Sequence, residues 1–527
     1  MLIINNLELS LDTDFSCLIP IVAKVLREPQ TEILSAELYR RSVDARRKSD
    51  IKFCCSVIVT AKNEGRILKR NKNAQKFVKP HYTWPKAERA PKNRPVIAGF
   101  GPAGMFAALA LARAGLRPIV LERGRAVDER TADVAAFFEG GRLDTESNVQ
   151  FGEGGAGTFS DGKLNTGIKD PRCRTVLEQF VKFGADRRIL TDAKPHIGTD
   201  VLVEVVRNLR NEVIALGGEV RFSSRLDGIR QQNGRLCGIL VNGEWIECDT
   251  LLLATGHSAR DTFAMLKSEG IEMIRKPFSM GVRIEHLQSD INRALYGDAA
   301  SHPALAAADY KLAVHLENGR GVYTFCMCPG GEVINASSEE GGIAVNGMSR
   351  SARDGVNANS AVLVSVAPED IEGDDVLAGC ALQKQIERAA FSAAGGSVPV
   401  TTVGEFLYGE PDSTGKVVPT VKPRAVNVPF EDIFPDFIVD SLREALPLFD
   451  RKLCGFADRA AVLTAPETRS SSPVRIVRAE DKQSVSLKGL YPCGEGAGYA
   501  GGIMSAATDG LATAESIVAE INQGNNL

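Results

Sequence analysis

The sequence predicts an α/β protein of several domains, and two observations carry the prediction. Residues 96–121 run in the order strand, glycine-rich turn, helix and strand, which is the repeating unit of a parallel sheet. Residues 251–253 are another short, wholly apolar run, typical of a buried strand. Between residues 277 and 455 the segments alternate polar and apolar side chains, which indicates an inserted, mostly antiparallel α+β substrate domain.

The first 92 residues predict a small N-terminal α/β domain with a linker. Residues 2–11 alternate like a strand, residues 18–26 have helical periodicity, and residues 53–59 are apolar and β-branched. From residue 61 onward the many Lys, Asn and Pro residues favour a linker.

This N-terminal part is basic. Residues 1–94 hold 19 Lys and Arg against 10 Asp and Glu, although the whole chain has a net charge of −3. The excess suits a solvated linker docked on an acidic body, and it also suits a surface for nucleic acid.

Composition bounds the class of protein. The chain is 44% hydrophobic and 24% charged, as in ordinary globular proteins, and no apolar run reaches the roughly 20 residues of a membrane helix. Its 11 cysteines are scattered without a CxxC pair, which favours a reducing, cytoplasmic setting over a disulfide framework. We therefore expect neither a membrane partner nor a metal site.

The turn after residue 98 is the most specific motif. Gly99 permits a tight turn, Gly101 allows backbone to approach a pyrophosphate, and Gly104 brings the helix close to the strand. The N-terminus of that helix, at Pro102 and Ala103, faces the phosphates with free N–H groups. Glu122 follows 21 residues after Gly101, where a carboxylate binds an adenosine ribose and disfavours a 2′-phosphate. A Rossmann-like site for FAD or NAD follows.

The dinucleotide domain is expected in two pieces, residues 93–276 and 456–527. The first piece contains a long polar glycine-rich stretch at 139–170, a type of loop that is usually functional, and an amphipathic helix at 199–216. The second piece returns to strand, glycine-rich turn and helix at 489–521. Within the inserted domain, residues 277–455, strands are expected at 279–285, 312–316 and 321–326, and helices at 382–394 and 437–446.

Four segments together resemble the FAD-dependent oxidoreductases of the glutathione-reductase type. They are the Gly99 turn with Glu122, the glycine-rich stretch, Ala254-Thr255-Gly256, and the late run from Gly489 to Ile503. The resemblance implies that Glu495 binds the ribityl chain and that the last helix stabilises charge on the reduced flavin. The cofactor residues so expected are Gly99, Gly101, Pro102, Ala103, Gly104, Glu122, Arg123, Gly155, Gly157, Thr158, Lys163, Ala254, Thr255, Gly256, Gly494, Glu495, Gly501, Gly502 and Ile503.

Longer segments resemble one family more closely, a group of poorly characterised FAD-dependent dehydrogenases with a distinctive C-terminal FAD-dependent domain. They include Phe151 to Lys163, Phe278 to His286, Phe325 to Gly331 and Glu467 to Arg475. Arg469-Ser470-Ser471 departs slightly from the Arg-Thr-Ser expected there. The resemblance implies bound FAD and a redox role, without a defined substrate.

Catalytic candidates are fewer. Cys326 and Cys328, spaced by two on an expected strand, would share one face and could relay electrons as a dithiol; two buried strand residues are the alternative. His257, after the ATG turn, could protonate substrate or flavin, or be an ordinary loop residue. Arg283, Arg469 and Arg475 could clamp an anion or form internal ion pairs.

The functional expectation is an FAD-dependent oxidoreductase that transfers hydride through flavin N5 to or from a small organic molecule, with an anion among the options. No second GxGxxG follows a strand, so NADH or NADPH would act only as a transient donor. Two alternatives stay open. One is an RNA-modifying flavoprotein that uses the basic N-terminal region, and the other is an FAD-binding sensor or docking protein without turnover.

Overall fold

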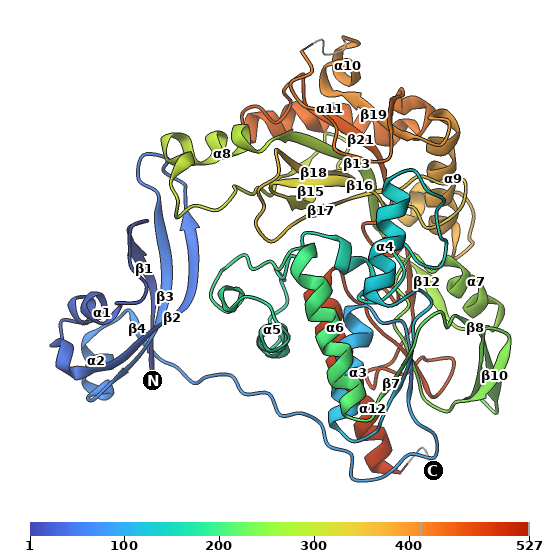
Figure 1. The fold of residues 1–527 in the computed structure, drawn as a ribbon, viewed down its shortest axis with the longest axis horizontal. Helices are drawn as coiled ribbons and strands as arrows, with labels where there is room; N and C mark the ends of the chain where they lie inside the picture. The colour runs from blue at the N-terminus through green and yellow to red at the C-terminus, as the bar shows by residue number, and fades with distance from the viewer. Residues whose placement is uncertain (411–413, 525–527) are drawn as a thin grey trace.

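The computed structural model describes residues 1–410 and 414–524, and it has the mixed α/β architecture that the sequence predicts (Figure 1). Sheets of four, five and seven strands lie in three separate parts of the molecule. Within the described ranges, no helix is both long enough and apolar enough to cross a bilayer.

The N-terminal unit is an antiparallel sheet of order β2-β3-β1-β4 whose one face is covered by two helices (Figure 1). Strand β3 buries every second side chain, as a half-covered sheet requires. The linker expected from residue 61 is wrong up to residue 76, because a helix anchored by buried Ile67 and a short strand continue the unit. The elements are β1 (Leu2–Leu9), α1 (Ile19–Leu26), β2 (Ile33–Asp44), β3 (Lys52–Ala61), α2 (Glu64–Arg70) and β4 (Ala74–Lys76).

The remaining linker, residues 77–94, begins against the N-terminal unit, where the Phe77 N–H donates to the Met1 carbonyl, and it contacts the body of the protein from Tyr82 onward. The Arg113 guanidinium stands 4.0 Å from the centre of the Trp84 ring, and the Tyr82 hydroxyl donates to Glu515 at 2.7 Å. Trp84 also packs against the apolar core around the parallel sheet. The basic linker is therefore docked, the first of the two options for this segment.

The central part is a five-stranded parallel sheet of order β23-β11-β5-β6-β7, whose strands are three residues long. Four of the five strands are almost wholly buried, which explains their uninterrupted apolar sequences. Its strands are β5 (Val96–Ala98), β6 (Ile119–Leu121), β7 (Glu219–Arg221), β11 (Leu251–Leu253) and β23 (Leu490–Pro492).

Different layers cover the two faces of this sheet. Helices α3, α5, α6 and α12 form one apolar core with it, and α3 lies along α12 (Figure 1). The other face packs on the antiparallel sheet β10-β9-β8, on α7 and on the pair β12–β22. The bounds are α3 (Pro102–Arg113), α4 (Val127–Phe138), α5 (Arg172–Lys182), α6 (Thr199–Ala215), α7 (Arg260–Ser268), α12 (Ile503–Gln523), β8 (Leu226–Gln232), β9 (Arg235–Val241), β10 (Glu244–Glu247), β12 (Met273–Arg275) and β22 (Val474–Ile476).

The inserted part is a seven-stranded sheet of order β14-β15-β18-β13-β21-β19-β20, antiparallel except for β19–β20. Helix α11 packs across it, and the hairpin β16–β17 also contacts it (Figure 1). The bounds are β13 (Phe278–Leu287), α8 (Gln288–Tyr296), β14 (Ala313–His315), β15 (Gly321–Cys328), β16 (Gly331–Asn335), β17 (Val345–Ser349), β18 (Asn357–Val366), α9 (Ala378–Ala393), β19 (Val398–Thr402), α10 (Val403–Tyr408), β20 (Ala425–Asn427), α11 (Asp436–Lys452) and β21 (Val462–Glu467).

The expected return to the dinucleotide domain at residue 456 comes before the last strand of this sheet. Strand β21 pairs with β13 and β19 in the middle of the seven strands. The chain therefore re-enters the parallel-sheet part only after Glu467, the last residue of β21.

Candidate functional site

The glycine turn between β5 and α3 is closed by backbone contacts. Gly99 has a φ of +99°, and a Cβ there would stand 2.3 Å from the Ala254 carbonyl oxygen. A Cβ on Gly104 would stand 1.9 Å from the Gly99 carbonyl oxygen, so α3 packs directly on the turn. At Gly101, the N-cap of α3, a Cβ would make only ordinary contact at 3.6 Å, and no side chain caps the helix. Gly101 therefore lines open space.

Glu122, at the end of β6, is 4% exposed and joins three backbone segments. Its carboxylate accepts hydrogen bonds from the N–H groups of Phe100 at 2.8 Å, Gly124 at 3.0 Å and Gly152 at 2.9 Å. A carboxylate offers about four lone-pair sites, so one acceptor position remains toward the cavity that Glu122 lines.

The glycine-rich stretch lies over this turn. The Gly154 N–H donates to the Phe100 carbonyl at 2.8 Å, and a 3₁₀ helix follows at Gly155–Phe159. Gly155 and Gly157 line the cavity, but Thr158 does not. The Thr158 side chain is 1% exposed and donates to the Glu153 carbonyl at 3.3 Å, so it does not face the cavity.

The N-terminus of α12 faces the same cavity. Gly502, its N-cap, has a φ of +102°, and no atom lies within 4 Å of a Cβ built on Gly501 or Gly502. Gly502 and Ile503 line the cavity, whereas Gly501 does not. The Gly502 N–H donates to the Glu495 carboxylate at 3.3 Å, which ties the helix start to the expected ribityl acid.

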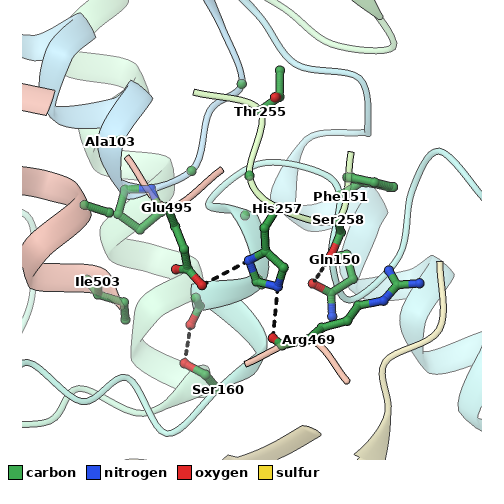
Figure 2. Close-up of a pocket in the computed structure, with 18 of the residues that line it drawn as sticks. Ala103, Gln150, Phe151, Ser160, Thr255, His257, Ser258, Arg469, Glu495 and Ile503 are labelled. Carbon is green, nitrogen blue, oxygen red and sulfur yellow. Dashed lines mark hydrogen bonds and ion pairs between the residues drawn. The ribbon is translucent and has the colours of Figure 1, made fainter. Parts of the chain in front are cut away.

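His257 and Glu495 form a hydrogen-bonded pair on the cavity wall. The two side chains point toward each other, and His257 also meets the Arg469 carbonyl (Figure 2). Burial opposes ionisation of Glu495, but the hydrogen bond and charge of His257 outweigh it and lower the pKa of the carboxyl.

Arg469 is held rigidly behind this pair. Its guanidinium contacts Glu387 at 2.9 and 3.0 Å, and Arg260 binds the same carboxylate at 2.8 Å. Burial opposes ionisation of Glu387, but the two guanidinium groups outweigh it and lower its pKa. Arg469 therefore serves an internal ion pair, and its carbonyl is fixed opposite His257.

The inserted part supplies the opposite wall. Arg283, fully buried, pairs with Glu467 at 2.8 Å and donates to the Cys326 carbonyl at 2.7 Å. The pairing of β15 with β18 shifts register between Phe325 and Cys328, and Cys326 has a φ of +42°. The regular strand expected at the two cysteines is thus wrong, because a β-bulge interrupts it.

Because of this bulge, the two thiols differ in their exposure. Cys326 is exposed to the cavity, whereas Cys328 is 1% exposed, although both line it. The cavity onto which Cys326 opens is itself enclosed by protein atoms. Desolvation by these atoms raises the pKa of the Cys326 thiol to about 12, against the lowering effect of Lys163. Burial also raises the pKa of Cys328. Neither thiol is a ready thiolate at neutral pH.

Most of the expected site residues meet in this one cavity. Gly104 and Gly494 do not line it and instead allow close contacts of α3, with the Gly99 carbonyl and Ala103 respectively. The expected residues that line it are Gly99, Gly101, Pro102, Ala103, Glu122, Arg123, Gly155, Gly157, Lys163, Ala254, Thr255, Gly256, His257, Cys326, Cys328, Glu495, Gly502 and Ile503. Arg123 does so while paired with Glu146 and Asp261.

Several lining residues have no local sequence signal. Asn346 and Gly347 come from β17, and a Cβ on Gly347 would stand 2.4 Å from the Arg283 guanidinium. A glycine inside a strand marks such a close approach, which is the one clue available from sequence. Glu467 and Ser470 belong to a segment noted only for its family resemblance.

An extended dinucleotide such as FAD fits these residues. The cavity runs from Glu122, Ser224 and Arg225 past the α3 turn to Cys326. Two helix N-termini without side-chain caps, those of α3 and α12, open on it and suit phosphate and developing negative charge. Among residues 1–410 and 414–524, no group of three or more His, Cys, Asp and Glu could hold a metal ion.

A match to a family model agrees with this fit. A family model described as "FAD-dependent protein, C-terminal domain-like" matches residues 277–470, and a domain of unknown function matches residues 1–60. The chain is also similar to CtdE, solved in complex with FAD, at 12% identity and a TM-score of 0.33 over 83% of this chain and 86% of that one.

Two sequence relatives differ widely in coverage. Protein FixC of Salmonella typhi is 26% identical over 170 residues, 31% of this chain and 36% of FixC. An uncharacterized protein of Clostridium beijerinckii is 48% identical over 522 residues, 98% of each chain. With a full-length relative at this identity and the family domain in place, the chain belongs to the poorly characterised family of FAD-dependent proteins that share this C-terminal domain.

Proposed function

We propose that the protein is an oxidoreductase in which FAD, when bound, supplies hydride transfer through its N5 atom to or from a small organic substrate. One observation carries the proposal. The cavity has a dinucleotide wall on one side and, on the other, a wall from the inserted part, in which Cys326 and Glu467 come from its sheet and Asn346 from the hairpin β16–β17. A cavity between two such walls can hold both a cofactor and a substrate.

Different residues of the cavity would have different roles. The α3 N-terminus and Gly101 would hold the pyrophosphate, and Glu122 would accept from the ribose. The α12 N-terminus would stabilise negative charge at the pyrimidine edge of the flavin. His257 and Glu495 would hold a proton beside it, and the inserted sheet would exclude water and orient the substrate.

The visible spectrum of the purified protein tests the proposal. We expect an oxidised flavin spectrum, with FAD released on denaturation, that bleaches anaerobically with NADH, with NADPH or with an organic substrate. Bleaching by one nucleotide would identify a transient nicotinamide donor. A protein without flavin would overturn the proposal, and bound FAD that no nucleotide or substrate reduces would favour the sensor role.

The RNA-modifying alternative gains no specific support. It depends on the basic N-terminal region, and the linker in that region uses Tyr82 and Trp84 for contacts with the body of the protein. Retention on RNA at low salt, lost without residues 1–94, would revive it.

A further inference from the structure

The end of the cavity nearest the inserted sheet has an unusual charge balance. Four permanently charged cations line the whole cavity, and three of them contact carboxylates closely. Arg123 pairs with Glu146 at 2.9 Å, Arg225 with Asp227 at 2.6 Å, and Arg469 with Glu387 at 2.9 Å. Lys163 is the fourth, and it has no such partner among the described residues.

The nearest carboxylate to Lys163 is already satisfied. The Lys163 ammonium lies 4.0 Å from Asp161, beyond hydrogen-bond distance. Both Asp161 oxygens bind the Arg353 guanidinium, one of them at 2.9 Å, and Ser349 also donates to this carboxylate. Arg353 therefore neutralises Asp161, and Lys163 keeps its charge.

The other carboxylate at this end is neutralised in the same way. Glu467 is paired with buried Arg283 at 2.8 Å. With both acids paired, Lys163 is left at this end of the cavity without a hydrogen-bonded carboxylate among the described residues. The Lys163 side chain is 23% exposed, so a counter-ion there would be attracted with less screening than on an open surface.

Cys326 faces the same region from the inserted sheet. Its left-handed backbone, at φ +42°, is held by the Arg283 hydrogen bond to its carbonyl. Strain of this kind in a cavity wall persists only where the surroundings enforce it, and it turns the thiol into the cavity. Lys163 and Cys326 both line the cavity, and the ammonium lowers the pKa of this thiol against the raising effect of burial.

We propose that Lys163 binds the carboxylate of a small, singly charged organic anion, whose body lies against Cys326. This substrate class rests on the proposed function, since the anion would be the redox partner of the flavin. The sequence suggested a cofactor contact for Lys163; in the structure the residue belongs to the end of the cavity that the inserted sheet closes.

The test compares two alkylating reagents that differ only in charge. Iodoacetate is an anion and iodoacetamide is neutral, and with both the same Cys326 thiolate forms an S–C bond while iodide leaves to solvent. The ratio of their rates on the holoprotein, read by peptide mass spectrometry, is therefore independent of the amount of thiolate. Exposed Cys17 is the internal reference. We expect the ratio at Cys326 to exceed that at Cys17 by about tenfold, given an unscreened positive charge nearby.

Variants assign this effect to Lys163. Lys163→Gln should reduce the ratio to that of Cys17, whereas Lys163→Arg should retain it. Lys182→Gln, which removes an exposed lysine paired with Glu212, is the matched control and should change nothing. Acetate should also protect Cys326 from iodoacetamide in wild type and in Lys163→Arg, and acetamide should not.

The outcomes separate this inference from the proposed function. Equal ratios at Cys326 and Cys17, or a ratio unchanged by Lys163→Gln, would overturn the anion site while flavin content stays normal. Loss of FAD from Lys163→Gln, with Lys163→Arg and wild type loaded, would assign Lys163 to the cofactor instead. A wild-type protein without flavin would defeat the proposed function, yet the alkylation ratios could still be measured.

Discussion

His257 Nδ1 lies 3.0 Å from a Glu495 carboxylate oxygen, while His257 Nε2 lies 2.9 Å from the Arg469 carbonyl oxygen (Figure 2). A carbonyl oxygen only accepts hydrogen bonds, so Nε2 carries a hydrogen. The contact at Nδ1 needs one further proton, on either the imidazole or the carboxyl. The two residues therefore act as one unit that holds a single shared proton beside the start of α12.

The pH dependence of stability reports on this pair. In wild type the pKa of Glu495 is lowered, so its contribution to stability is complete above the unfolded pKa, about 4.3, and is lost as pH falls through the folded value. In His257→Gln the largest lowering causes are gone, and burial, which raises the pKa, is opposed only by the Gly502 N–H and by Lys276. The variant should then lose about 1–3 kcal/mol at pH 7, and the loss should shrink toward pH 4.

Urea denaturation of wild type and His257→Gln between pH 4 and pH 8 measures this difference. The double variant His257→Gln/Glu495→Gln has no carboxyl to titrate and should remove the pH dependence of the loss. Lys276 also lowers the pKa of Glu495, and half-buried Arg475 acts electrostatically on Lys276, so Lys276→Gln should give a smaller effect of the same sign. A loss in His257→Gln that is independent of pH would contradict the shared proton.

Two glycines of the α3 turn should respond differently to alanine. At Gly104 the new Cβ would stand 1.9 Å from a backbone oxygen, so Gly104→Ala should destabilise the fold by several kcal/mol or prevent folding. At Gly101 the nearest atom is 3.6 Å away, so Gly101→Ala should fold with wild-type stability. The new methyl group would occupy the space for the pyrophosphate, so the FAD content of Gly101→Ala should be lower than that of wild type by about tenfold or more.

Thermal unfolding of the flavin-free proteins and FAD content per chain measure the two effects separately. Full FAD retention by a folded Gly101→Ala protein would remove the α3 turn from the cofactor site.

The backbone at Cys326 gives a stability prediction. At φ +42° glycine is relaxed, whereas any residue with a Cβ is strained. Cys326→Gly should therefore be more stable than Cys326→Ala by about 0.5–1 kcal/mol, the reverse of the usual order inside a strand. Denaturation midpoints of the two variants measure this, and alanine being the more stable would mean that β15 has no bulge there.

The sequence predicts the dinucleotide wall well because its constraints are local. Gly99 and Gly104 are needed for contacts within a few residues or with the adjacent strand, and Glu122 ends the next strand of the same unit. Such requirements fix residue types at short spacings, so the sequence shows them as a motif. Even here the direction of the Thr158 side chain could not be predicted, because a polar residue in a glycine-rich loop can turn inward to a carbonyl as easily as outward to a ligand.

The cavity wall from the inserted part could not be predicted because it depends on distant pairings. Asn346 and Glu467 meet only when β17 and β21 contact each other across the inserted sheet. The alternation of apolar and polar residues in β15 is that of a regular strand, so it gives no sign that the register shifts at the bulge beside Cys326. Lys163 likewise lacks a hydrogen-bonded carboxylate because Arg353, 190 positions away, binds Asp161.

Glu122 is the residue where fold and cofactor binding should be inseparable. Its carboxylate accepts from three buried N–H groups, and glutamine would present an NH₂ group to at least one of them. Glu122→Gln should therefore cost about 1–3 kcal/mol of unfolding free energy in the flavin-free protein and also weaken FAD retention. Exposed Glu129 on α4 provides the control, since Glu129→Gln removes the same charge without touching the turn. Urea midpoints and FAD content should fall together in the first variant and remain unchanged in the second. If Glu122→Gln kept its stability and lost only FAD, the carboxylate would serve the ribose alone, and the turn would be held by its glycines.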